Sequence, residues 1–469
     1  MRLAPAQMEL NRKRILVVGL GKSGVAAALF LRKRGAQVTV SDSRSEQSLA
    51  KELPALLDAG IMVEAGGHGL LTFRRQDLIV VSPGVPTNTP ELVQARSLGV
   101  PVIGELELAS RFLEGGIIAI TGSNGKTTTT TLVGEIFKAA GVPTLVGGNI
   151  GLPVIQFVEQ STSQTVSVLE VSSFQLETTE QFHPRIAVIL NITPDHLDRH
   201  GNLENYIAAK QKIAANQTAN DALVLNADDD ITQRAASRLA AQGATLPNIY
   251  WFSRTRVVRQ GAFVHDGTIM FRETELKAAE PIMPVAEISL KGTHNVENVL
   301  AAVCAARLAA IPPETIRATV AGFKAVEHRL EFVAKVNGVE YYNDSKATNV
   351  DATIKALESF PGGVHLILGG KDKDSDYSQL DKLLRKKVRV VYTIGSAAEK
   401  IETQLAGAAK IIRAEKLEQA VTLAGSNAVD GEIVLLAPAC ASFDQFENYE
   451  HRGRAFKQSV AALQQNAGK

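Results

Sequence analysis

The chain has 469 residues, 45% of them hydrophobic, so it can bury several cores and form about three domains. Its 50 lysines and arginines balance 49 aspartates and glutamates, which excludes the strongly basic surface that attracts nucleic acid or an anionic membrane. The two cysteines, Cys304 and Cys440, lack metal-ligand spacing, which argues against a disulfide framework or a zinc site. No apolar run approaches the roughly 18 residues of a membrane helix, so we expect a cytoplasmic protein without membrane insertion.

Four short apolar runs before residue 104 predict a first parallel sheet. The first run leads into a glycine-rich turn and then an Ala- and Leu-rich helix that ends at Gly35, a pattern typical of a strand–helix–strand unit. The expected strands are Ile15–Val18, Val38–Asp42, Leu78–Val81 and Val100–Ile103.

The turn after the first strand is a candidate nucleotide site. Residues Gly19–Gly24 match the pattern G-x-G-x-x-G, and Asp42 follows the last glycine by eighteen residues. This pattern predicts a dinucleotide with Asp42 on a ribose hydroxyl, but its specificity is weak. The same geometry can hold the diphosphate of a UDP-sugar, so both alternatives stay open on this motif alone.

The strongest single motif is Gly-Ser-Asn-Gly-Lys-Thr at Gly122–Thr127. It follows the apolar strand Ile117–Ile120 and opens a helix that runs to Gly141, as a phosphate-binding loop does. The backbone N–H groups of such a loop hold phosphates, Lys126 neutralises charge and Thr127 offers a hydroxyl to Mg²⁺. Only two residues separate the glycines, so the loop departs from the common G-x-x-x-x-G-K-[ST] form. The alternative is an ordinary glycine turn.

Later apolar runs extend the central sheet. The dipeptide Asp266-Gly267 predicts a type I′ hairpin turn, because both residues tolerate positive φ angles. A helix from Asn295 to Ala310 is expected to close this domain, with the next boundary near residue 325. The expected strands are Val166–Leu169, Ile186–Leu190, Ala222–Leu225, Ala262–Val264 and Thr268–Phe271.

Acidic and imidazole side chains at strand ends are candidate magnesium ligands. Glu170 ends one predicted strand, and Asp195-His196-Leu197-Asp198 follows another. A carboxylate beside a phosphate loop can bind Mg²⁺ directly or through water, whereas the alternative for Glu170 is a solvated charge. His196 is the candidate ligand of the second group. His183 and His200 are expected to be hydrogen-bonded structural residues.

Lys210 occupies an unexpected position for a charged residue. On the helix expected from about Asn202 to Asn216 it shares one stripe with apolar residues such as Tyr206 and Ile207, so it points inward. The spacing favours a snorkelling side chain whose ammonium reaches water. The alternative is a buried lysine whose charged form is destabilised, so that its neutral amine becomes a nucleophile.

Several polar residues after residue 290 are candidate ligand contacts. The segment Gly292–Asn298 puts Asn295 and Asn298 on one helix face, where they could read a base edge or simply cap the helix. Cys440 is interpreted as a buried core thiol. Asp344, Lys371 and Ser442 follow strand ends, where open α/β sheets place ligands. The expected strands are Val339–Tyr342, Val364–Leu368, Val388–Tyr392 and Ile433–Leu436.

Taken together, these motifs resemble the Mur ligases of peptidoglycan synthesis over essentially the whole chain. The central matches are Thr121–Thr128, Gly148–Gly151, Leu169–Leu176, Asp195–Asp198 and His294-Asn295. The C-terminal matches resemble the branch of the family that adds D-glutamate, and they are Asn343–Asn349, Gly369–Lys371 and Pro438–Phe446. Sister ligases and folylpolyglutamate synthetases share the central loop but carry different residues at Asp344–Thr348.

The resemblance implies an α/β fold of three domains. Residues 1–104 would form a Rossmann-like UDP-sugar domain, 105–325 a P-loop ATP domain with a mostly parallel sheet, and 326–469 a Rossmann-like amino-acid domain. The implied reaction joins the carboxylate of UDP-N-acetylmuramoyl-L-alanine (UDP-MurNAc-L-Ala) to the amine of D-glutamate, with ATP converted to ADP and phosphate through an acyl phosphate. We expect two Mg²⁺ ions, a monomer, and an open form that closes around these small-molecule substrates.

The resemblance also implies roles for single residues. The ATP-binding set is Gly122, Ser123, Asn124, Gly125, Lys126, Thr127, Thr128, Asn295 at adenine, Arg329 and Asp344. The metal ligands are Thr127, Glu170, His196 and Lys210, the last as a carbamate formed with carbon dioxide. The catalytic set is Lys126, His196, Lys210 and Lys346, of which Lys346 stabilises phosphate charge. The UDP-sugar set is Ser23, Asp42, Ser43, Arg44 and Asn149, and the D-glutamate set is Thr348, Lys371, Ser442 and Tyr449.

Three further residues are compared with the family. Tyr449 stands where familiar members of the family have Phe, so only a backbone role carries over. His328 and Arg329 match the family's interdomain segment.

On the motifs alone, three other functions stay open: a P-loop kinase or NTPase, a nicotinamide-dependent dehydrogenase, and a nucleotide sensor without catalysis.

Overall fold

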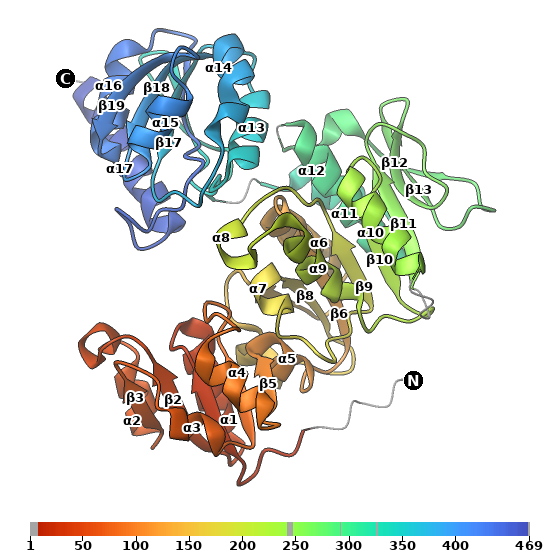
Figure 1. Ribbon diagram of the computed structural model, residues 1–469. Coiled ribbons are helices and arrows are strands. Elements are labelled where there is room, and N and C mark those ends of the chain that lie inside the picture. The colour runs from red at the N-terminus through yellow and green to blue at the C-terminus, as the bar shows by residue number, and fades with distance from the viewer. Residues whose placement is uncertain (1–7, 242–246, 291, 325–326, 468–469) are drawn as a thin grey trace. The chain divides into compact units, whose positions relative to one another are not determined.

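The computed structural model describes residues 8–241, 247–290, 292–324 and 327–467 (Figure 1). They group into two compact units. The first comprises Met1–Ile192, Glu204–Ala286 and Asn298–Val320, and the second Thr193–Leu203, Glu287–Glu297 and Ala321–Lys469. The predicted boundary between residues 325 and 326 falls on positions outside the described residues. Among the described helices, none is long and apolar enough to cross a membrane.

The first unit begins with a five-stranded parallel sheet in the order β3-β2-β1-β4-β5. Leu16 and Val18 of β1 pack against Phe73 of α3 and Leu92 of α4, so these two helices cover one face. The strands are β1 (Arg14–Val18), β2 (Gln37–Asp42), β3 (Met62–Ala65), β4 (Leu78–Val81) and β5 (Val102–Gly104). The helices are α1 (Lys22–Lys33), η1 (Glu46–Leu49), α2 (Leu53–Asp58), α3 (Leu70–Arg74) and α4 (Pro90–Ser97).

A nine-stranded sheet follows in the order β14-β13-β12-β11-β10-β9-β6-β8-β7. It is parallel from β7 to β12 and ends in an antiparallel meander. The predicted hairpin turn is confirmed, since Asp266 and Gly267 have φ angles of 46° and 70°. The strands are β6 (Gly116–Thr121), β7 (Thr144–Gly148), β8 (Val166–Glu170), β9 (Ile186–Ile189), β10 (Ala222–Asn226), β11 (Asn248–Ser253), β12 (Gly261–His265), β13 (Thr268–Arg272) and β14 (Glu280–Pro284).

The helices between these strands are mostly short. The long predicted helix after residue 202 is α9 (Leu203–Gln211), continued by the 3₁₀ turn η3 (Lys212–Ala214). The others are α5 (Glu105–Ser110), α6 (Lys126–Ala139), η2 (Val154–Gln160), α7 (Ser173–Leu176), α8 (Leu197–His200), α10 (Asp230–Ala241), η4 (Val285–Glu287), α11 (Thr293–Leu308) and α12 (Pro313–Gly322).

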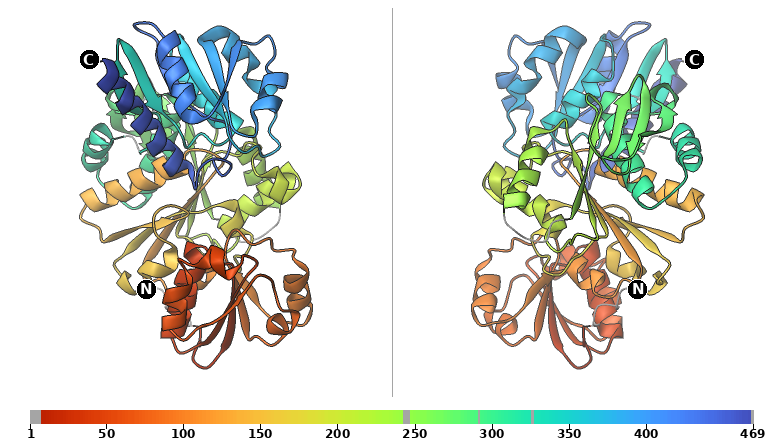
Figure 2. Two further views of the ribbon diagram at one scale, coloured as in Figure 1. Left: turned by 90° about the vertical axis from the view of Figure 1, so that its left-hand side faces the viewer. Right: turned by 90° about the vertical axis from the view of Figure 1, so that its right-hand side faces the viewer.

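The second unit is built on a six-stranded sheet in the order β15-β16-β20-β17-β18-β19, parallel except for β15. Alternate residues of the strands face opposite cores: Leu366 packs toward α13, whereas Ile367 packs toward α16 and α17. The ribbon views show helices of this unit on both sides of the sheet (Figures 1 and 2). The strands are β15 (Glu331–Val336), β16 (Val339–Asn343), β17 (Val364–Gly369), β18 (Val388–Ile394), β19 (Lys410–Glu415) and β20 (Ile433–Leu436). The helices are α13 (Val350–Glu358), η5 (Tyr377–Leu380), α14 (Asp381–Lys387), α15 (Ala398–Gln404), α16 (Leu417–Asn427) and α17 (Tyr449–Ala467).

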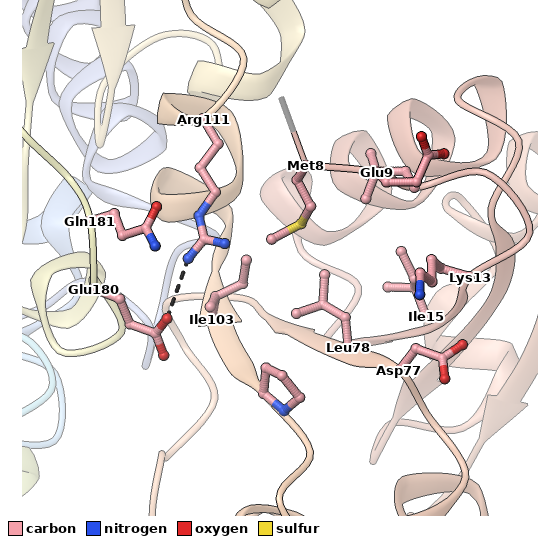
Figure 3. A pocket seen from close by; sticks show the side chains of 12 residues that line it. Met8, Glu9, Lys13, Ile15, Asp77, Leu78, Ile103, Arg111, Glu180 and Gln181 are labelled. Carbon is pink, nitrogen blue, oxygen red and sulfur yellow. Dashed lines mark hydrogen bonds and ion pairs between the residues drawn. The ribbon is translucent and has the colours of Figure 1, made fainter. Parts of the chain in front are cut away.

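The short helix α5 joins the first two sheets through buried carboxylates. Glu107 is fully buried and accepts hydrogen bonds from the backbone N–H groups of residues 180 to 182, at 2.8 to 3.1 Å. Arg111 pairs with Glu107 at 2.8 Å and with Glu180 at 3.3 Å (Figure 3). The cavity in Figure 3, about 290 Å³, lies at the amino ends of β1 and β4, away from the carboxyl ends where ligands are expected.

Glu105 is the second buried carboxylate of α5. Its Oε1 accepts the Ile155 N–H at 2.7 Å, and its Oε2 is buried with no hydrogen-bond partner among the described residues. Burial raises the pKa of Glu105 from 4.5 to about 7, and the hydrogen bond from Ile155 offsets only part of that rise. The folded protein therefore holds a proton on Glu105 that the unfolded chain releases near pH 4.5.

We predict that Glu105→Gln stabilises the protein above neutral pH. As pH rises from about 4.5 to 7 the wild type loses stability, because the unfolded chain ionises first, and the full loss persists above pH 7. The amide keeps an acceptor for Ile155 and cannot ionise. The stability difference should therefore grow across this range toward a ceiling of about 3 kcal/mol. Thermal unfolding of both proteins at pH 5 and pH 8 measures it. Exposed Glu114→Gln is the control, and an equal difference at both pH values would contradict the prediction.

Candidate active site

The phosphate loop lies between β6 and α6 and is held by the neighbouring strand end. Gly122 and Gly125 have φ angles of 155° and 85°, which glycine adopts without strain. Asn191, just after β9, accepts the Asn124 N–H on its Oδ1 at 2.9 Å and donates its Nδ2–H to the Asn124 carbonyl at 3.1 Å. Its own carbonyl accepts the Ser123 N–H at 2.9 Å. Asn191 therefore holds the loop through three hydrogen bonds.

Two lysine side chains bind one carbonyl oxygen of this loop. Lys126 Nζ donates to the carbonyls of Gly122 and Ser123, both at 2.9 Å. Lys210 Nζ donates to the same Gly122 carbonyl at 2.8 Å. The ammonium groups thus converge at the point where a phosphate loop needs positive charge.

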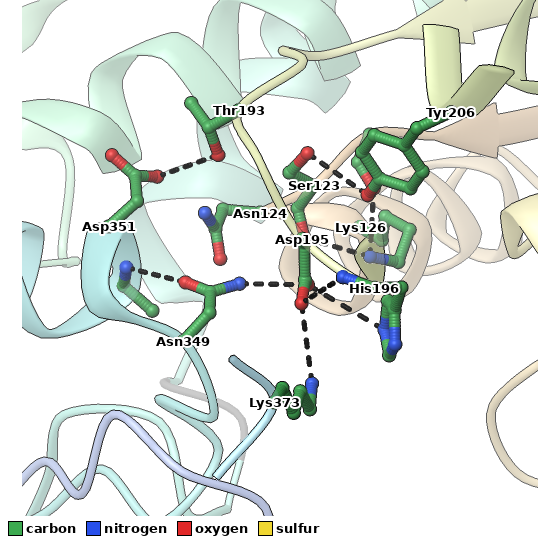
Figure 4. A network of polar contacts seen from close by, with 12 residues as sticks. Ser123, Asn124, Lys126, Thr193, Asp195, His196, Tyr206, Asn349, Asp351 and Lys373 are labelled. Atoms are coloured by element: carbon green, nitrogen blue, oxygen red, sulfur yellow. Dashed lines mark hydrogen bonds and ion pairs between the residues drawn. The ribbon is translucent and has the colours of Figure 1, made fainter. Parts of the chain in front are cut away.

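Lys210 itself is only 1% exposed. The snorkelling interpretation is therefore wrong, because the Gly122 carbonyl gives the ammonium an internal partner. Its Nζ also lies 4.5 Å from the centre of the Tyr206 ring, one turn earlier on α9. The Tyr206 hydroxyl lies 3.1 Å from Ser123 Oγ (Figure 4). Helix α9 and the phosphate loop are thus joined by polar side chains in a buried setting.

Glu170 ends β8 beside the phosphate loop and is 1% exposed, so the solvated-charge alternative is wrong. Its Oε2 accepts the Thr127 hydroxyl at 2.7 Å, and its Oε1 accepts Asn149 Nδ2–H at 2.8 Å. A carboxylate and a hydroxyl are the oxygen donors that Mg²⁺ prefers. Thr127 and Glu170 therefore fit a magnesium ion next to the phosphate loop.

Polar side chains of the first sheet gather at its carboxyl edge. Asp42, at the end of β2, accepts the Leu20 N–H of the glycine turn at 2.7 Å. Arg44 binds both carboxylate oxygens of Asp42, at 3.1 and 3.0 Å. Burial acts to raise the pKa of Asp42, but the hydrogen bonds from Arg44 and Leu20 outweigh it, so the pKa is lowered. Ser23 is half-buried in the first turn of α1, and Ser43 is exposed beside Asp42.

In the second unit, Asp195 connects the segment before α8 to two loops of the C-terminal sheet. Its Oδ2 accepts Asn349 Nδ2–H at 3.0 Å, and its Oδ1 accepts Lys373 Nζ–H at 3.3 Å (Figure 4). His196 Nε2 lies 3.6 Å from Asp195 Oδ2, and its φ angle of 54° is left-handed. The Asn349 and Lys373 contacts were not expected from the sequence, although both residues lie inside or next to motifs that it singled out.

Asp344, directly after β16, is 2% exposed and offers an unused acceptor. Its Oδ1 has no hydrogen-bond partner among the described residues. Burial raises its pKa to about 6, and the charges of Arg329 and Lys346 offset part of that rise. A bound hydroxyl or amine would therefore find a ready acceptor here.

Lys346 and Tyr449 are also in contact. Lys346 Nζ lies 3.2 Å from the Tyr449 hydroxyl and 4.8 Å from the ring centre. The Tyr449 carbonyl accepts the Ser345 hydroxyl at 2.8 Å. Tyr449 thus contributes its backbone to this loop, and its hydroxyl makes a contact that Phe could not make.

The remaining predicted residues lie as follows. Lys371 pairs with Ala441 through two backbone hydrogen bonds, which brings Lys371 beside the buried Ser442. Thr348 is half-buried in the loop after β16. Asn295 is buried in the first turn of α11, and its role at adenine stays a prediction. The structural prediction for His183 is confirmed, since its Nε2 lies 2.6 Å from Asp221.

Other isolated groups agree with their simpler interpretations. Cys304 and Cys440 are buried free thiols. Among the described residues, the one cluster with metal-ligand spacing is Glu327, His328 and Glu331. Lys457 Nζ already binds both of its carboxylates, at 2.6 and 2.9 Å, so an internal cation occupies the position that a metal ion would take.

Comparisons with known proteins agree along the chain. Three family models match it: "Mur ligase MurD-like, N-terminal domain" over residues 13–104, "Mur ligase middle domain" over 120–306, and "Mur ligase, glutamate ligase domain" over 328–440. A UDP-N-acetylmuramoylalanine--D-glutamate ligase of Acidobacterium capsulatum is 67% identical, covering 97% of each chain. One of Koribacter versatilis is 60% identical, covering 97% of this chain and 99% of the relative.

Solved structures show the same fold at low identity. A pseudomurein peptide ligase type C from Methanothermus fervidus matches with a TM-score of 0.59 and 20% identity, covering 96% of this chain and all of the other. The predicted fold class, three domains of α/β type with mostly parallel sheets, is therefore confirmed.

We predict that Gly125→Ala weakens nucleotide binding while the fold is kept. A Cβ at this left-handed position would overlap Asn298 Oδ1, so the Asn298 side chain or the loop must move, and the positive φ strains the alanine in either case. Backbone strain alone costs about 1–3 kcal/mol, and the overlap adds to it, so affinity should fall by at least about tenfold. Calorimetric titration with an ATP analogue and Mg²⁺ measures this. Gly141→Ala is the matched control, because its φ of 75° is similar but no atom lies near the new Cβ. Equal affinity in both variants would contradict the proposed importance of the loop shape.

Proposed function

Because the chain belongs to the Mur ligase family, we propose that it joins D-glutamate to UDP-MurNAc-L-Ala with conversion of ATP to ADP and phosphate, in the synthesis of peptidoglycan precursors. The observation that carries the proposal is the 67% identity, over 97% of both chains, to a relative named for this reaction. ATP-dependent ligation is the activity of the family. The side chains around the phosphate loop support the same chemistry from this chain's own geometry.

The reaction must first activate a carboxylate, which is a poor electrophile as an anion. One oxygen of the L-alanine carboxylate attacks the γ-phosphorus of ATP, and ADP leaves. The amine of D-glutamate then attacks the acyl carbon, phosphate leaves with the bridging oxygen, and the amine loses a proton. Both steps bring anions together, so the enzyme contributes mainly positioning and positive charge.

The phosphate loop would supply much of that charge. Lys126 now binds the loop carbonyls of Gly122 and Ser123, and bound phosphates would replace these bonds. Magnesium reduces the repulsion between the attacking carboxylate and the nucleotide phosphates. Thr127 and Glu170 would hold one ion, since their oxygens already face each other 2.7 Å apart. His196 is proposed as a further ligand when the second unit meets the nucleotide.

Lys210 suits the carbamate that the family resemblance implies. A buried ammonium is costly, and addition of carbon dioxide would convert it into an anion with two oxygens for a second magnesium ion. The carbamate nitrogen keeps one N–H, which can still donate to the Gly122 carbonyl that Lys210 now binds at 2.8 Å. The present contact and the proposed modification are therefore compatible. Lys210 would act by orienting metal rather than by touching substrate.

The other proposed contacts are divided among the sheets. Ser23, Asp42, Ser43, Arg44 and Asn149 would hold the UDP-sugar, with Arg44 oriented by its two bonds to Asp42. Asp344 and Arg329 would contact ATP, and the unused Oδ1 of Asp344 suits a hydroxyl donor. Lys346 would stabilise the transferred phosphoryl group. Thr348, Lys371, Ser442 and Tyr449 would hold D-glutamate.

Residues of both units must act on the same substrates, so we propose closure around the ligands during each cycle. Activated sugar nucleotides and ATP are cytoplasmic metabolites, which makes the cytoplasm the proposed location. Every residue named above belongs to one chain, so the proposed enzyme acts as a monomer.

The proposed function predicts that phosphate release from ATP requires both UDP-MurNAc-L-Ala and D-glutamate. Coupled phosphate detection measures the rate, and mass spectrometry identifies the new amide. Hydroxylamine added without D-glutamate should trap the acyl phosphate as a hydroxamate. Hydrolysis of ATP by water would support an NTPase, and transfer of the phosphoryl group to a hydroxyl would support a kinase. Reduction of a nicotinamide would support a dehydrogenase, and nucleotide binding without turnover would support a sensor. Any of these results without amide formation would reject the proposal.

For Lys210 we predict that Lys210→Ala loses at least about a hundredfold in kcat and that added acetate or formate restores part of it, by replacing the carbamate oxygens. Lys212→Ala is the control, because Lys212 is exposed and its Nζ donates to the Glu177 carbonyl, away from the phosphate loop. Steady-state rates at rising carboxylate concentration measure the rescue. A Lys210→Ala enzyme as active as the control would exclude the proposed role.

A further inference from the structure

The first turn of α17 contains a buried cation that the proposed reaction does not use. Arg452 has no exposed surface and ranks first among the fully buried side chains by volume. Burial lowers its pKa to about 10, with the neighbouring Cys440 and Asp444 acting in the opposite direction, so it remains charged at neutral pH. A buried charge is stable only when its hydrogen-bonding groups are satisfied. The partners of Arg452 therefore show what it holds.

The first partner is the loop after β16. Arg452 Nη2 donates to the Ser345 carbonyl at 2.8 Å, and its Nε donates to Ser345 Oγ at 3.0 Å. The Ser345 hydroxyl in turn donates to the carbonyl of Tyr449, one turn before Arg452 on α17. Ser345 directly precedes Lys346 and lies three residues before Thr348. The guanidinium thus holds the loop that carries both residues.

The second partner is the loop after β20. The Cys440 carbonyl accepts from Arg452 Nη1 and Nη2, both at 3.2 Å, and the Ala441 carbonyl accepts from Nη1 at 3.4 Å. Ser442 follows directly. These two loops follow the paired strands β16 and β20, and Ala439 N–H also donates to the Ala347 carbonyl at 2.9 Å. Arg452 adds a buried side-chain link between them beyond this backbone contact.

The third loop, after β17, is held through the second. Lys371 N–H donates to the Ala441 carbonyl at 2.9 Å, and Ala441 N–H donates to the Lys371 carbonyl at 3.1 Å. Arg452 Nη1 also packs against Gly370, where a side chain would overlap the Ala441 carbonyl and lie 3.1 Å from the guanidinium. All three loops that carry candidate D-glutamate residues therefore converge on one side chain.

We propose that Arg452 is a positioning residue for the amino-acid substrate, and that its guanidinium sets the spacing of the loops carrying Thr348, Lys371 and Ser442. This inference rests on the proposed function, because it assigns those three residues to D-glutamate. Arg452 binds mainly backbone carbonyls and has no surface for substrate, so it acts through the loops. Its planar fork of five N–H donors can bind two loops at once, which a lysine ammonium on a single flexible stem cannot reproduce.

Other side chains of α17 make its contacts with the domain core. Phe456 and Val460 of α17 pack into the apolar core beneath the sheet, and α16 packs there as well. Loss of the guanidinium should therefore loosen the loops at the sheet edge while the sheet and its helices persist. A role in overall stability alone would lower the unfolding temperature without changing substrate affinity selectively.

The test compares Arg452→Met and Arg452→Lys with Val460→Ala, which removes buried methyl groups from the same helix without touching a loop. We expect Arg452→Met to raise the KM for D-glutamate by about ten- to a hundredfold, the range expected when binding groups shift by about 1 Å. The KM for UDP-MurNAc-L-Ala should change by less than about threefold. Arg452→Lys should lie between Arg452→Met and the wild type. Val460→Ala should lower the unfolding temperature and leave both KM values unchanged.

A second measurement does not require activity. Hydrogen exchange of the backbone amides should accelerate in Arg452→Met at residues 344–348, 370–371 and 440–442, and remain slow in β17 and β20. Unchanged exchange in these loops, an unchanged KM for D-glutamate, or an equal rise in KM in Val460→Ala would each overturn the inference. Failure of the proposed function is distinguishable, because the wild-type enzyme itself would then show no phosphate release that depends on D-glutamate.

Discussion

Parallel pairing of β6 with both β8 and β9 is the constraint on which the candidate site depends. Because the three strands run in the same direction, their carboxyl ends lie at one edge, and the residues that follow them become neighbours. The phosphate loop follows β6, Glu170 ends β8 and Asn191 follows β9. The contacts among Thr127, Glu170, Asn124 and Asn191 are the direct result. A change of strand order would separate groups that are remote in sequence.

Buried charge is the second recurring feature, and backbone carbonyls stabilise it in both units. Lys210 binds the Gly122 carbonyl, and Arg452 binds the carbonyls of Ser345 and Cys440. Each bond satisfies a desolvated cation and at the same time holds a loop in one shape. An apolar side chain of similar size would fill the space, but it would remove these donors and leave the Gly122 carbonyl with Lys126 alone. Each buried cation therefore stabilises the shape of a loop, and the loop carbonyls in turn stabilise the cation.

Buried carboxylates behave differently, because some keep an oxygen free. Glu105 and Asp344 each have one oxygen without a partner among the described residues, and burial raises the pKa of both. For Glu105 the free oxygen is a cost to the fold at neutral pH. For Asp344, which lies at the sheet edge where we propose that ATP binds, the unpartnered oxygen is an acceptor available to a ligand donor. Glu170 has both oxygens occupied, and a metal ion would compete for them with the Thr127 hydroxyl.

The sequence by itself determined the α/β fold class, the strands with continuous buried apolar runs and the glycine loops, because apolar periodicity and turn residues are local signals. It missed β3, β7, β11, β14, β15 and β19, in each of which most residues are half-buried or exposed. Only the tertiary structure decided that Lys210 is buried rather than snorkelling, and that Arg452 joins loops near residues 345 and 440. Each outcome depends on a carbonyl partner remote in sequence, 88 residues away for Lys210 and 107 residues away for Arg452, and helical spacing contains no information about such partners.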